Sequence, residues 1–249
     1  MSGRQLQVIG VAGLPEVRPG DDLAAMIAER VDLEDGDVVV VAQKVVSKAE
    51  GRIRALADVV PGELARHYAK RLEADARIVQ VILDESVRIV RDERVLIVET
   101  RHGYVCANAG VDHSNTGGGE TVTLLPEDPD ASAERLREGL AGRTGRDVGV
   151  IVADTFGRAW RMGIANVALG VAGAPALLDY RGLPDDFGLE LAATVVAVAD
   201  ELACAAELVM GKTGRVPVAV VRGYRPPAAA VPVGRGRALI RPAELDLFR

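Results

Sequence analysis

The stretch "DVGVIVADT", residues 147–155, says most about the fold of this chain. A continuous apolar run that ends in a carboxylate predicts a β-strand buried on both faces. The stretches "DGDVVVVAQ" (35–43), which follows a turn signal, and "VPVAVVRGY" (216–224) predict two further buried strands. The helices expected between such strands follow no regular βαβ alternation. This order favours an α+β fold with mixed sheets over a doubly wound Rossmann fold.

The remaining elements are predicted from apolar spacing and from turn residues. Helices are expected over residues 21–31, 61–84 and 128–145, the last with Asp130 as its N-cap. Residues 192–210 predict either one long helix or a strand followed by a helix. Shorter strands are expected over residues 6–11, 87–91, 94–100, 103–110 and 120–126.

Length and composition describe a globular protein. The chain has 249 residues, of which 49% are apolar and 27% charged, with a mean hydropathy of +0.15. We expect one domain over residues 1–224, followed by a Pro/Ala-rich linker or wrapping arm over 225–249. Aromatic residues make up only 3%, which argues against a base-stacking platform for single-stranded nucleic acid. The net charge of −6 argues against broad binding of a phosphate backbone, but one local basic cluster still suffices for a small anion.

Cysteine usage and hydropathy indicate a cytoplasmic protein. Cys106 and Cys204 stand in apolar contexts, "YVCANA" and "ELACAAE", without any CxxC or Cys/His ligand spacing. Two buried thiols are therefore expected rather than a zinc site or a disulfide. No apolar run approaches the roughly 18 residues of a membrane span, and the N-terminus has no signal-peptide layout.

Two carboxylates are candidates for binding a cation. Asp112 and Asp154 each follow an apolar strand and precede small or hydroxyl residues, and Thr155, Arg158 and Arg161 come directly after Asp154. Hard cations prefer such oxygen ligands and share the phosphate oxygens of a substrate, which arginine forks also bind. The same residues also fit ordinary structural roles, with Asp112 in a turn, Asp154 as a helix cap and the arginines on a solvated face.

Basic and glycine-containing segments bear on nucleotide binding. Lys44, Lys48 and Arg52 recur every four residues, which places them on one helical face that suits either a triphosphate or solvent. The stretch "MGKTG" (210–214) matches only half of a P-loop, because Ala206 stands at the first glycine position and a helix is expected before it. A P-loop is therefore excluded. No GxSxG, Ser/His/Asp order or GxGxxG motif is present either, so classical hydrolases and Rossmann dehydrogenases are poor candidates.

Taken together, long stretches of the chain resemble the coenzyme F420-0:L-glutamate ligase family. The stretches that carry this resemblance are "GLPEVRPGDDL", "DGDVVVVAQKVVSKAEGR", "NAGVDHSN", "VIVADTFGRAWR", "DDFGLEL", "VADELACAAELVMGK" and "PVAVVRGY". The resemblance implies GTP-dependent addition of L-glutamate to F420-0, with Mg²⁺ or Mn²⁺ at two sites and with K⁺. It further implies an intertwined homodimer with the F420 ligase-type fold, unrelated to P-loop proteins. The chain resembles the free-standing form rather than members fused to a flavin-binding domain.

The resemblance also assigns residues. It implies that Asp112 and Asp154 bind one divalent ion and that Thr155 binds the second. The residues that it matches to GTP binding are Leu14, Pro15, Glu16, Val17, Gln43, Lys44, Lys48, Asn115, Met210, Gly211, Lys212, Thr213, Gly214, Arg215, Val216 and Pro217. Lys212 is a departure, because some members carry an acidic residue there that helps to hold the second metal. The resemblance assigns no role to Arg158 and Arg161, which we predict, from the chemistry of arginine, to bind the phosphodiester or a carboxylate of F420-0.

The implied reaction activates a carboxylate. Phosphoryl transfer from GTP to the terminal carboxylate of F420-0 gives an acyl phosphate, and the amine of glutamate then displaces phosphate to form an amide. The sequence identifies no general base for that amine. Two other functions are compatible with the same residues. One is a metal-dependent phosphohydrolase that uses the carboxylates on water, and the other is a non-catalytic GTP-binding protein.

Overall fold

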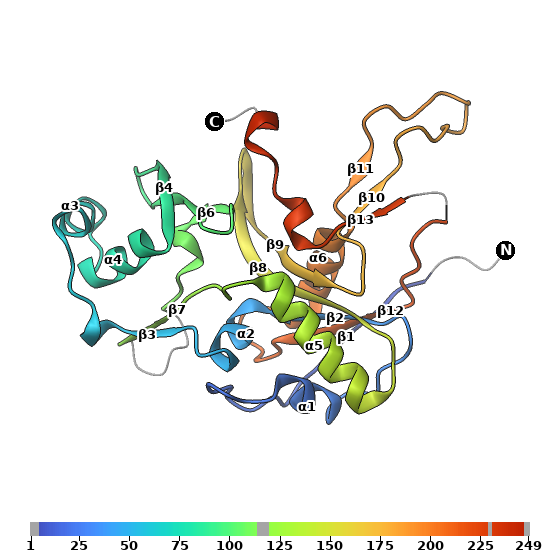
Figure 1. The fold of residues 1–249 in the computed structure, drawn as a ribbon, viewed down its shortest axis with the longest axis horizontal. Helices are drawn as coiled ribbons and strands as arrows, with labels where there is room; N and C mark the ends of the chain where they lie inside the picture. The colour runs from blue at the N-terminus through green and yellow to red at the C-terminus, as the bar shows by residue number, and fades with distance from the viewer. Residues whose placement is uncertain (1–4, 114–119, 229–230, 247–249) are drawn as a thin grey trace.

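A mixed five-stranded sheet forms the body of the molecule (Figure 1). The computed structural model describes residues 5–113, 120–228 and 231–246. The strand order is β1-β12-β2-β8-β9, and only β2 and β8 pair in parallel. The bounds are β1 Gln7–Gly10, β2 Val38–Ala42, β8 Gly149–Arg158, β9 Arg161–Ala172 and β12 Val218–Arg222. The three buried strands predicted from sequence, β2, β8 and β12, therefore lie together in the middle of the sheet.

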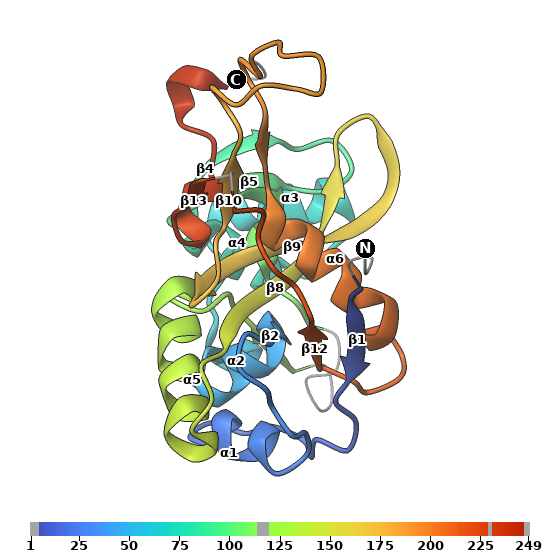
Figure 2. The same cartoon turned by 90° about the vertical axis from the view of Figure 1, so that its right-hand side faces the viewer.

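Helices cover both faces of this sheet (Figures 1 and 2). On one face α1 (Leu23–Ala28) and α5 (Pro129–Thr144) pack on alternate valines of β2 and β8, and on the other face α6 (Val198–Met210) packs on the intervening residues. The central valines are buried completely because both faces are covered. Separate sheets outside the body complete a mixed α+β architecture, so the predicted α+β class is confirmed and a Rossmann fold is absent from the described residues.

The start of α5 corrects one sequence prediction. Asp128, not Asp130, is the N-cap, and its side chain accepts a hydrogen bond from the amide of Ala131 at 3.0 Å. Pro129 occupies the first turn, where its missing N–H is harmless, and this shifts the cap two residues earlier than predicted. The Asp130 carboxylate instead accepts from the amides of Val171 and Gly236, both at 2.8 Å, and so fastens the C-terminal segment to β9.

A second region, which we call the inserted lobe, comprises the described residues between 53 and 124 (Figure 1). Its elements are β3 Ile53–Ala55, η1 Leu56–Asp58, α3 Glu63–Leu72, α4 Ala76–Asp84, β4 Ser86–Arg91, β5 Ile97–Thr100, β6 Val105–Ala107, η2 Asn108–Gly110 and β7 Thr121–Thr123. The single helix predicted over 61–84 is two helices, because Glu73 takes a left-handed conformation (φ 53°) and Asp75 caps α4. The lobe joins the body between α2 (Gln43–Ala49) and α5.

The strands outside the central sheet and the inserted lobe form a separate three-stranded sheet beside α6. Here β10 (Leu177–Asp179) pairs with β11 (Val195–Val196) and with β13 (Val231–Val233) from the Pro/Ala-rich segment. Two 3-10 helices, η3 (Gly236–Leu239) and η4 (Ala243–Leu245), follow, and Ile240 packs on the cluster around Tyr104. The described residues of the 225–249 segment thus contact the rest of the chain, while the domain boundary at 224 stays a prediction. β11 followed by α6 confirms the strand-then-helix alternative for residues 192–210.

The two cysteines differ in exposure. Cys106 is buried, as predicted, but Cys204 is exposed, so the prediction of two buried thiols is wrong for Cys204. The buried face of α6 carries Leu202, Ala203 and Ala206, and Cys204 lies beside that stripe despite its apolar neighbours in sequence. No helix in the described part of the chain is long and apolar enough to cross a membrane.

Candidate active site

One edge of the central sheet gathers the predicted functional residues. Because β2 and β8 run in parallel, with Ala42 opposite Ala153, the residues that follow these two positions reach the same edge of the sheet. The amide of Ala42 donates to the carbonyl of Pro217 at 2.9 Å, which brings the loop before β12 to that edge as well. This arrangement is the one that places ligand sites beyond the carboxyl ends of parallel strands.

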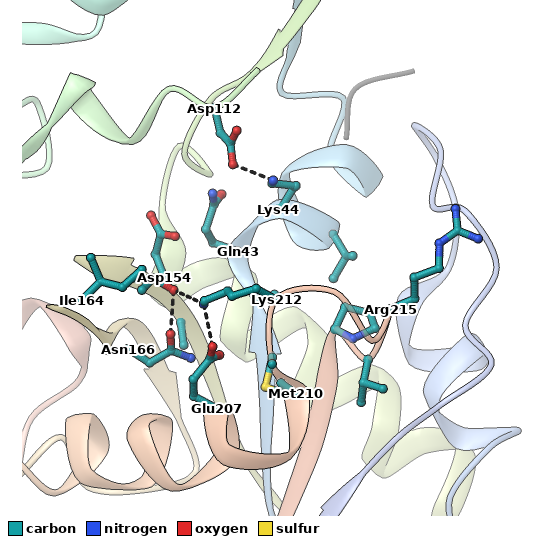
Figure 3. A pocket seen from close by; sticks show the side chains of 17 residues that line it. Gln43, Lys44, Asp112, Asp154, Ile164, Asn166, Glu207, Met210, Lys212 and Arg215 are labelled. Atoms are coloured by element: carbon teal, nitrogen blue, oxygen red, sulfur yellow. Dashed lines mark hydrogen bonds and ion pairs between the residues drawn. The ribbon is translucent and has the colours of Figure 1, made fainter. Parts of the chain in front are cut away.

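A pocket of about 420 Å³ opens at this edge (Figure 3). Its lining residues come from both strand ends, the inserted lobe, β9, α6 and the 210–217 loop: Ala42, Gln43, Lys44, Val45, Asp112, Ala153, Asp154, Thr155, Ile164, Asn166, Glu207, Met210, Gly211, Lys212, Arg215, Val216 and Pro217. A smaller hollow of about 180 Å³ shares Gln43, Asp112, Asp154 and Thr155 and extends towards the inserted lobe. Both predicted carboxylates therefore face one continuous polar space.

Asp112 reaches the pocket from the inserted lobe. Its backbone forms an isolated antiparallel bridge with Thr123, through N–H···O contacts of 3.0 and 2.8 Å. Just before it, Asn108 and Ala109 both have positive φ (53° and 54°), an uncommon conformation for non-glycine residues that turns the chain sharply. The carboxylate forms an ion pair of 2.5 Å with the ammonium of Lys44 on α2. The ion pair thus links the inserted lobe to the body across the pocket.

Asp154 lies within β8 at the floor of the pocket. Burial, with a smaller contribution from the negative charge of Asp112, raises the pKa of its carboxyl to about 6, while the backbone amide of Thr155 and the charges of Lys44 and Lys212 act in the opposite direction. A carboxylate destabilised by desolvation and by a second carboxylate gains from a bound cation. The pair Asp112 and Asp154 therefore has the donor chemistry of a divalent cation site.

Thr155 belongs to a hydrogen-bonded cluster whose other members, Asn166, Glu207 and Lys212, are labelled in Figure 3. Its hydroxyl donates to Oδ1 of Asn166, its register partner on β9, at 2.7 Å. The ammonium of Lys212 donates to the same hydroxyl oxygen at 2.6 Å and pairs with Glu207 on α6 at 2.7 Å. Sequence reasoning missed Asn166 and Glu207, because the strand β9 was not predicted and Glu207 reads as a surface residue of a helix.

Comparison with known proteins shows which family the chain belongs to. The family model for F420-0:Gamma-glutamyl ligase matches residues 12–223. The chain belongs to this family. It is 47% identical to the coenzyme F420:L-glutamate ligase of Methanothermobacter thermautotrophicus, over 98% of this chain and 99% of that protein. It is 48% identical to the protein of that name from Methanopyrus kandleri over 94% of each chain, and 50% identical to the one from Halobacterium salinarum over 88% and 87%.

The residues that the F420-0:gamma-glutamyl ligase resemblance assigned to GTP fall into two groups. Gln43, Lys44, Met210, Gly211, Lys212, Arg215, Val216 and Pro217 line the pocket, whereas the described residues Leu14, Pro15, Glu16, Val17, Lys48, Thr213 and Gly214 are not part of its lining. Glu16 instead forms an ion pair with Lys48, and the side chain of Val17 is buried in the core. The side chain of Arg215 points away from the carboxylates (Figure 3). Asn115 lies outside the described residues.

Arg158 and Arg161, predicted to bind F420-0, lie opposite each other at the end of the β8–β9 hairpin. Both are exposed, and neither belongs to the pocket lining among the described residues. A guanidinium nitrogen of Arg158 donates to the carbonyl of Met162 at 3.0 Å. Their role in binding F420-0 stays a prediction.

The two predicted metal positions differ in how well the residues fit a cation. Asp112 and Asp154 offer two carboxylates to one ion, which would complete its shell with oxygens from phosphate or water. The described residues contain no group of three or more His, Cys, Asp or Glu side chains placed to hold a metal unaided. At the second position, the Thr155 oxygen already accepts from the ammonium of Lys212. These residues fit one divalent ion well and do not fit a second.

Proposed function

We propose that this chain is a GTP-dependent ligase that joins L-glutamate to coenzyme F420-0 in the biosynthesis of coenzyme F420. The observation that carries the proposal is the pocket that Asp112 and Asp154, from different regions, line together with Lys44 and Lys212. In a member of the F420-0:gamma-glutamyl ligase family, such a pocket suits two anionic reactants. A buried, preorganised set of charges stabilises the charge that develops during phosphoryl and acyl transfer.

The proposed reaction has two steps. In the first, a carboxylate oxygen of F420-0 attacks the γ-phosphorus of GTP, the bond to the bridging oxygen breaks, and GDP leaves. In the second, the amine of glutamate, after it loses a proton, attacks the acyl carbon of the acyl phosphate. The bond from that carbon to the phosphate oxygen breaks, which releases inorganic phosphate and leaves an amide. Activation is needed because the oxygen of a free carboxylate is a poor leaving group.

Each charged residue of the pocket has a proposed role. Asp112 and Asp154 hold one Mg²⁺ or Mn²⁺, which when bound neutralises phosphate charge and orients the phosphate for transfer. Lys44, at the start of α2, pairs with phosphate oxygens once Asp112 has turned to the cation. The buried amide of Gln43, whose oxygen accepts from Ser47 at 2.9 Å, fixes the start of α2 beside the nucleotide. A dependence on K⁺ is also part of the proposal.

A homodimer is the proposed assembly. The outer part of the β8–β9 hairpin exposes large apolar side chains, with Trp160 81% and Met162 95% accessible in the single chain. Apolar side chains gathered in this way mark interaction surfaces more often than chance exposure does. Analytical ultracentrifugation of the native protein and of Trp160→Ser tests the homodimer separately from the reaction. The native protein is expected to sediment as a dimer and Trp160→Ser as a monomer, because only dimerisation is expected to depend on the hairpin.

The decisive experiment is mass spectrometry of F420-0 incubated with the protein, L-glutamate, GTP and Mn²⁺. A product heavier by one or more glutamyl units supports the ligase and counts the additions. GTP hydrolysis with unchanged F420-0, independent of glutamate, would favour the phosphohydrolase. Untouched GTP and F420-0, with GTP bound, would favour the non-catalytic GTP-binding protein.

A further inference from the structure

The Thr155 side of the pocket is built around an ammonium group. Lys212 lies two residues beyond α6, and its Nζ reaches back to the Thr155 hydroxyl at 2.6 Å and to the Glu207 carboxylate at 2.7 Å. The backbone amide of Gly211 donates to the carbonyl of Glu207 and closes the helix end directly before Lys212. The lysine is therefore directed into the pocket by the helix that also supplies its carboxylate partner.

The oxygens on this side have few free positions for a second divalent cation. The Thr155 hydroxyl gives its proton to Asn166, which is only 4% exposed, and accepts from Lys212 on its oxygen. Glu207 is already neutralised by the same ammonium. A divalent ion at Thr155 would lie against the positive charge of Lys212, and like charges repel each other.

The Asp112 side has the opposite charge balance. Two carboxylates, Asp112 and Asp154, face that side of the pocket, and the ammonium beside them is that of Lys44. The negative charge in excess attracts a cation. On the Thr155 side, one carboxylate, Glu207, is matched by one ammonium, Lys212. The pocket thus has an Asp112 side whose excess negative charge favours a divalent ion, and a Thr155 side where the protein itself supplies the positive charge.

We propose that the Lys212 ammonium is the permanent cation on the Thr155 side of the site, in place of a second divalent ion, so that each protomer binds one divalent cation with its nucleotide. The inference rests on the proposed function, because it assumes that GTP occupies this pocket. A lysine ammonium is a compact point charge with three donors, and it can hold phosphate oxygens without exchanging ligands. Thr155 and Glu207 then position Lys212 rather than bind metal.

The test is to count bound Mn²⁺ by electron paramagnetic resonance in the presence of a non-hydrolysable GTP analogue. The native chain is expected to bind one Mn²⁺ per protomer with a single-ion spectrum. Lys212→Glu removes the ammonium and adds a carboxylate beside Thr155 and Glu207, so it is expected to bind two. Two Mn²⁺ ions about 3.5–4 Å apart give a spin-coupled spectrum that a lone ion cannot give. Lys70→Glu, the same change at an exposed lysine on α3, is the matched control and is expected to keep one ion.

Two coupled Mn²⁺ ions in the native chain would overturn the inference while leaving the ligase proposal intact. A single ion in a folded Lys212→Glu protein would overturn it too, since the ammonium would not be what excludes the second ion. Native protein that binds no Mn²⁺ would contradict both proposals, whereas failure of the ligase alone appears in the mass-spectrometric assay. If Lys212→Glu does not fold, the number of Mn²⁺ ions bound by the native chain still tests the inference.

Discussion

The two carboxylates of the site stand on regions of different construction. Asp154 continues a strand whose preceding residues, Val150 to Val152, are completely buried between helices on both faces. Asp112 stands on the inserted lobe, which has two smaller clusters of its own, and its backbone pairs with Thr123 through an isolated bridge rather than through a strand of a larger sheet. The main core therefore fixes the half of the pocket around Asp154, which we call the fixed half. The position of the other half, around Asp112, depends on the position of the inserted lobe relative to the central sheet.

The largest effect is expected from removing the carboxylate on the fixed half. Asp154→Asn keeps the shape of the side chain but removes the charge that binds the cation. Activity is expected to fall by at least about 100-fold, because losing a residue that only supports a metal ligand already costs up to that much. Glutamate-dependent GDP release, measured at saturating Mn²⁺, gives the loss. Asp112→Asn is expected to lose a comparable amount.

The matched control for these variants is Asp147→Asn, two residues before the start of the same strand. Its carboxylate is 89% exposed and, within the described residues, forms an ion pair with Arg137 alone, at 3.4 Å. It is expected to retain full activity. Full activity in a folded Asp154→Asn protein would mean that this carboxylate holds no essential cation.

The next largest effect separates the two regions by stability. Leu140 on α5 and Leu96 in the inserted lobe are both completely buried, in different clusters. Each change to Ala leaves a cavity worth about 2–5 kcal/mol. Leu140→Ala is expected to lower the free energy of global unfolding, whereas Leu96→Ala is expected to open the lobe first and to weaken Mn²⁺ and GTP binding.

Hydrogen exchange measures this difference directly. In Leu96→Ala the faster exchange is expected to be confined to amides of the inserted lobe, and in Leu140→Ala it is expected to reach the central sheet. The comparison between the regions fails if both variants show the same pattern of exchange. Denaturant unfolding of each variant supplies the control, since it reports the total loss of stability.

The sequence revealed the parts of the fold that local patterns encode. The apolar runs of β2, β8 and β12 identified the middle of the sheet, and the acids at strand ends identified Asp112 and Asp154 as pocket residues. The inserted lobe as a separate region and the twelve-residue strand β9 were not predicted. The first four residues of β9 are exposed at the hairpin end and the last five are all buried, so the burial pattern changes along the strand and shows no period of two.

The residues missed in the site share one physical cause. Asn166 and Glu207 acquire their roles only through pairing between distant segments, across β8–β9 in one case and from α6 to the 210–217 loop in the other. Neither has a local signature, because a polar residue in a strand and an acid on a helix are both ordinary on a surface. Lys212 was identified from the sequence as a departure from the acidic residue of some family members, but its partners follow only from the tertiary structure.

A smaller effect is expected from the hydroxyl that orients Lys212 on the fixed half. Thr155→Val keeps the shape and removes the acceptor of the ammonium, so kcat is expected to fall about 10-fold to 100-fold, as for loss of one hydrogen bond of about 1.5–3 kcal/mol to a charged group. Thr155→Ser keeps the hydroxyl and is expected to restore most of the rate. The Mn²⁺ count is expected to stay at one in both. Loss of bound Mn²⁺ in Thr155→Val would instead make Thr155 a metal ligand.

The smallest effect concerns the two thiols, one on each region. Burial raises the pKa of Cys106, in the inserted lobe, to about 12, and the negative charge of Asp154 adds to that shift. Desolvation also raises the pKa of Cys204, on α6, but its side chain is exposed. A raised pKa lowers the thiolate fraction at neutral pH, and the thiolate is the nucleophile.

An aromatic disulfide reagent is therefore expected to label one thiol, that of Cys204, in the native protein. This labelling is expected to be slow at neutral pH and to become faster as the pH rises, and both thiols are expected to react in denaturant. Cys204→Ser should abolish the native reaction. Rapid native labelling of Cys106 would mean that the lobe opens far more often than its buried cluster allows.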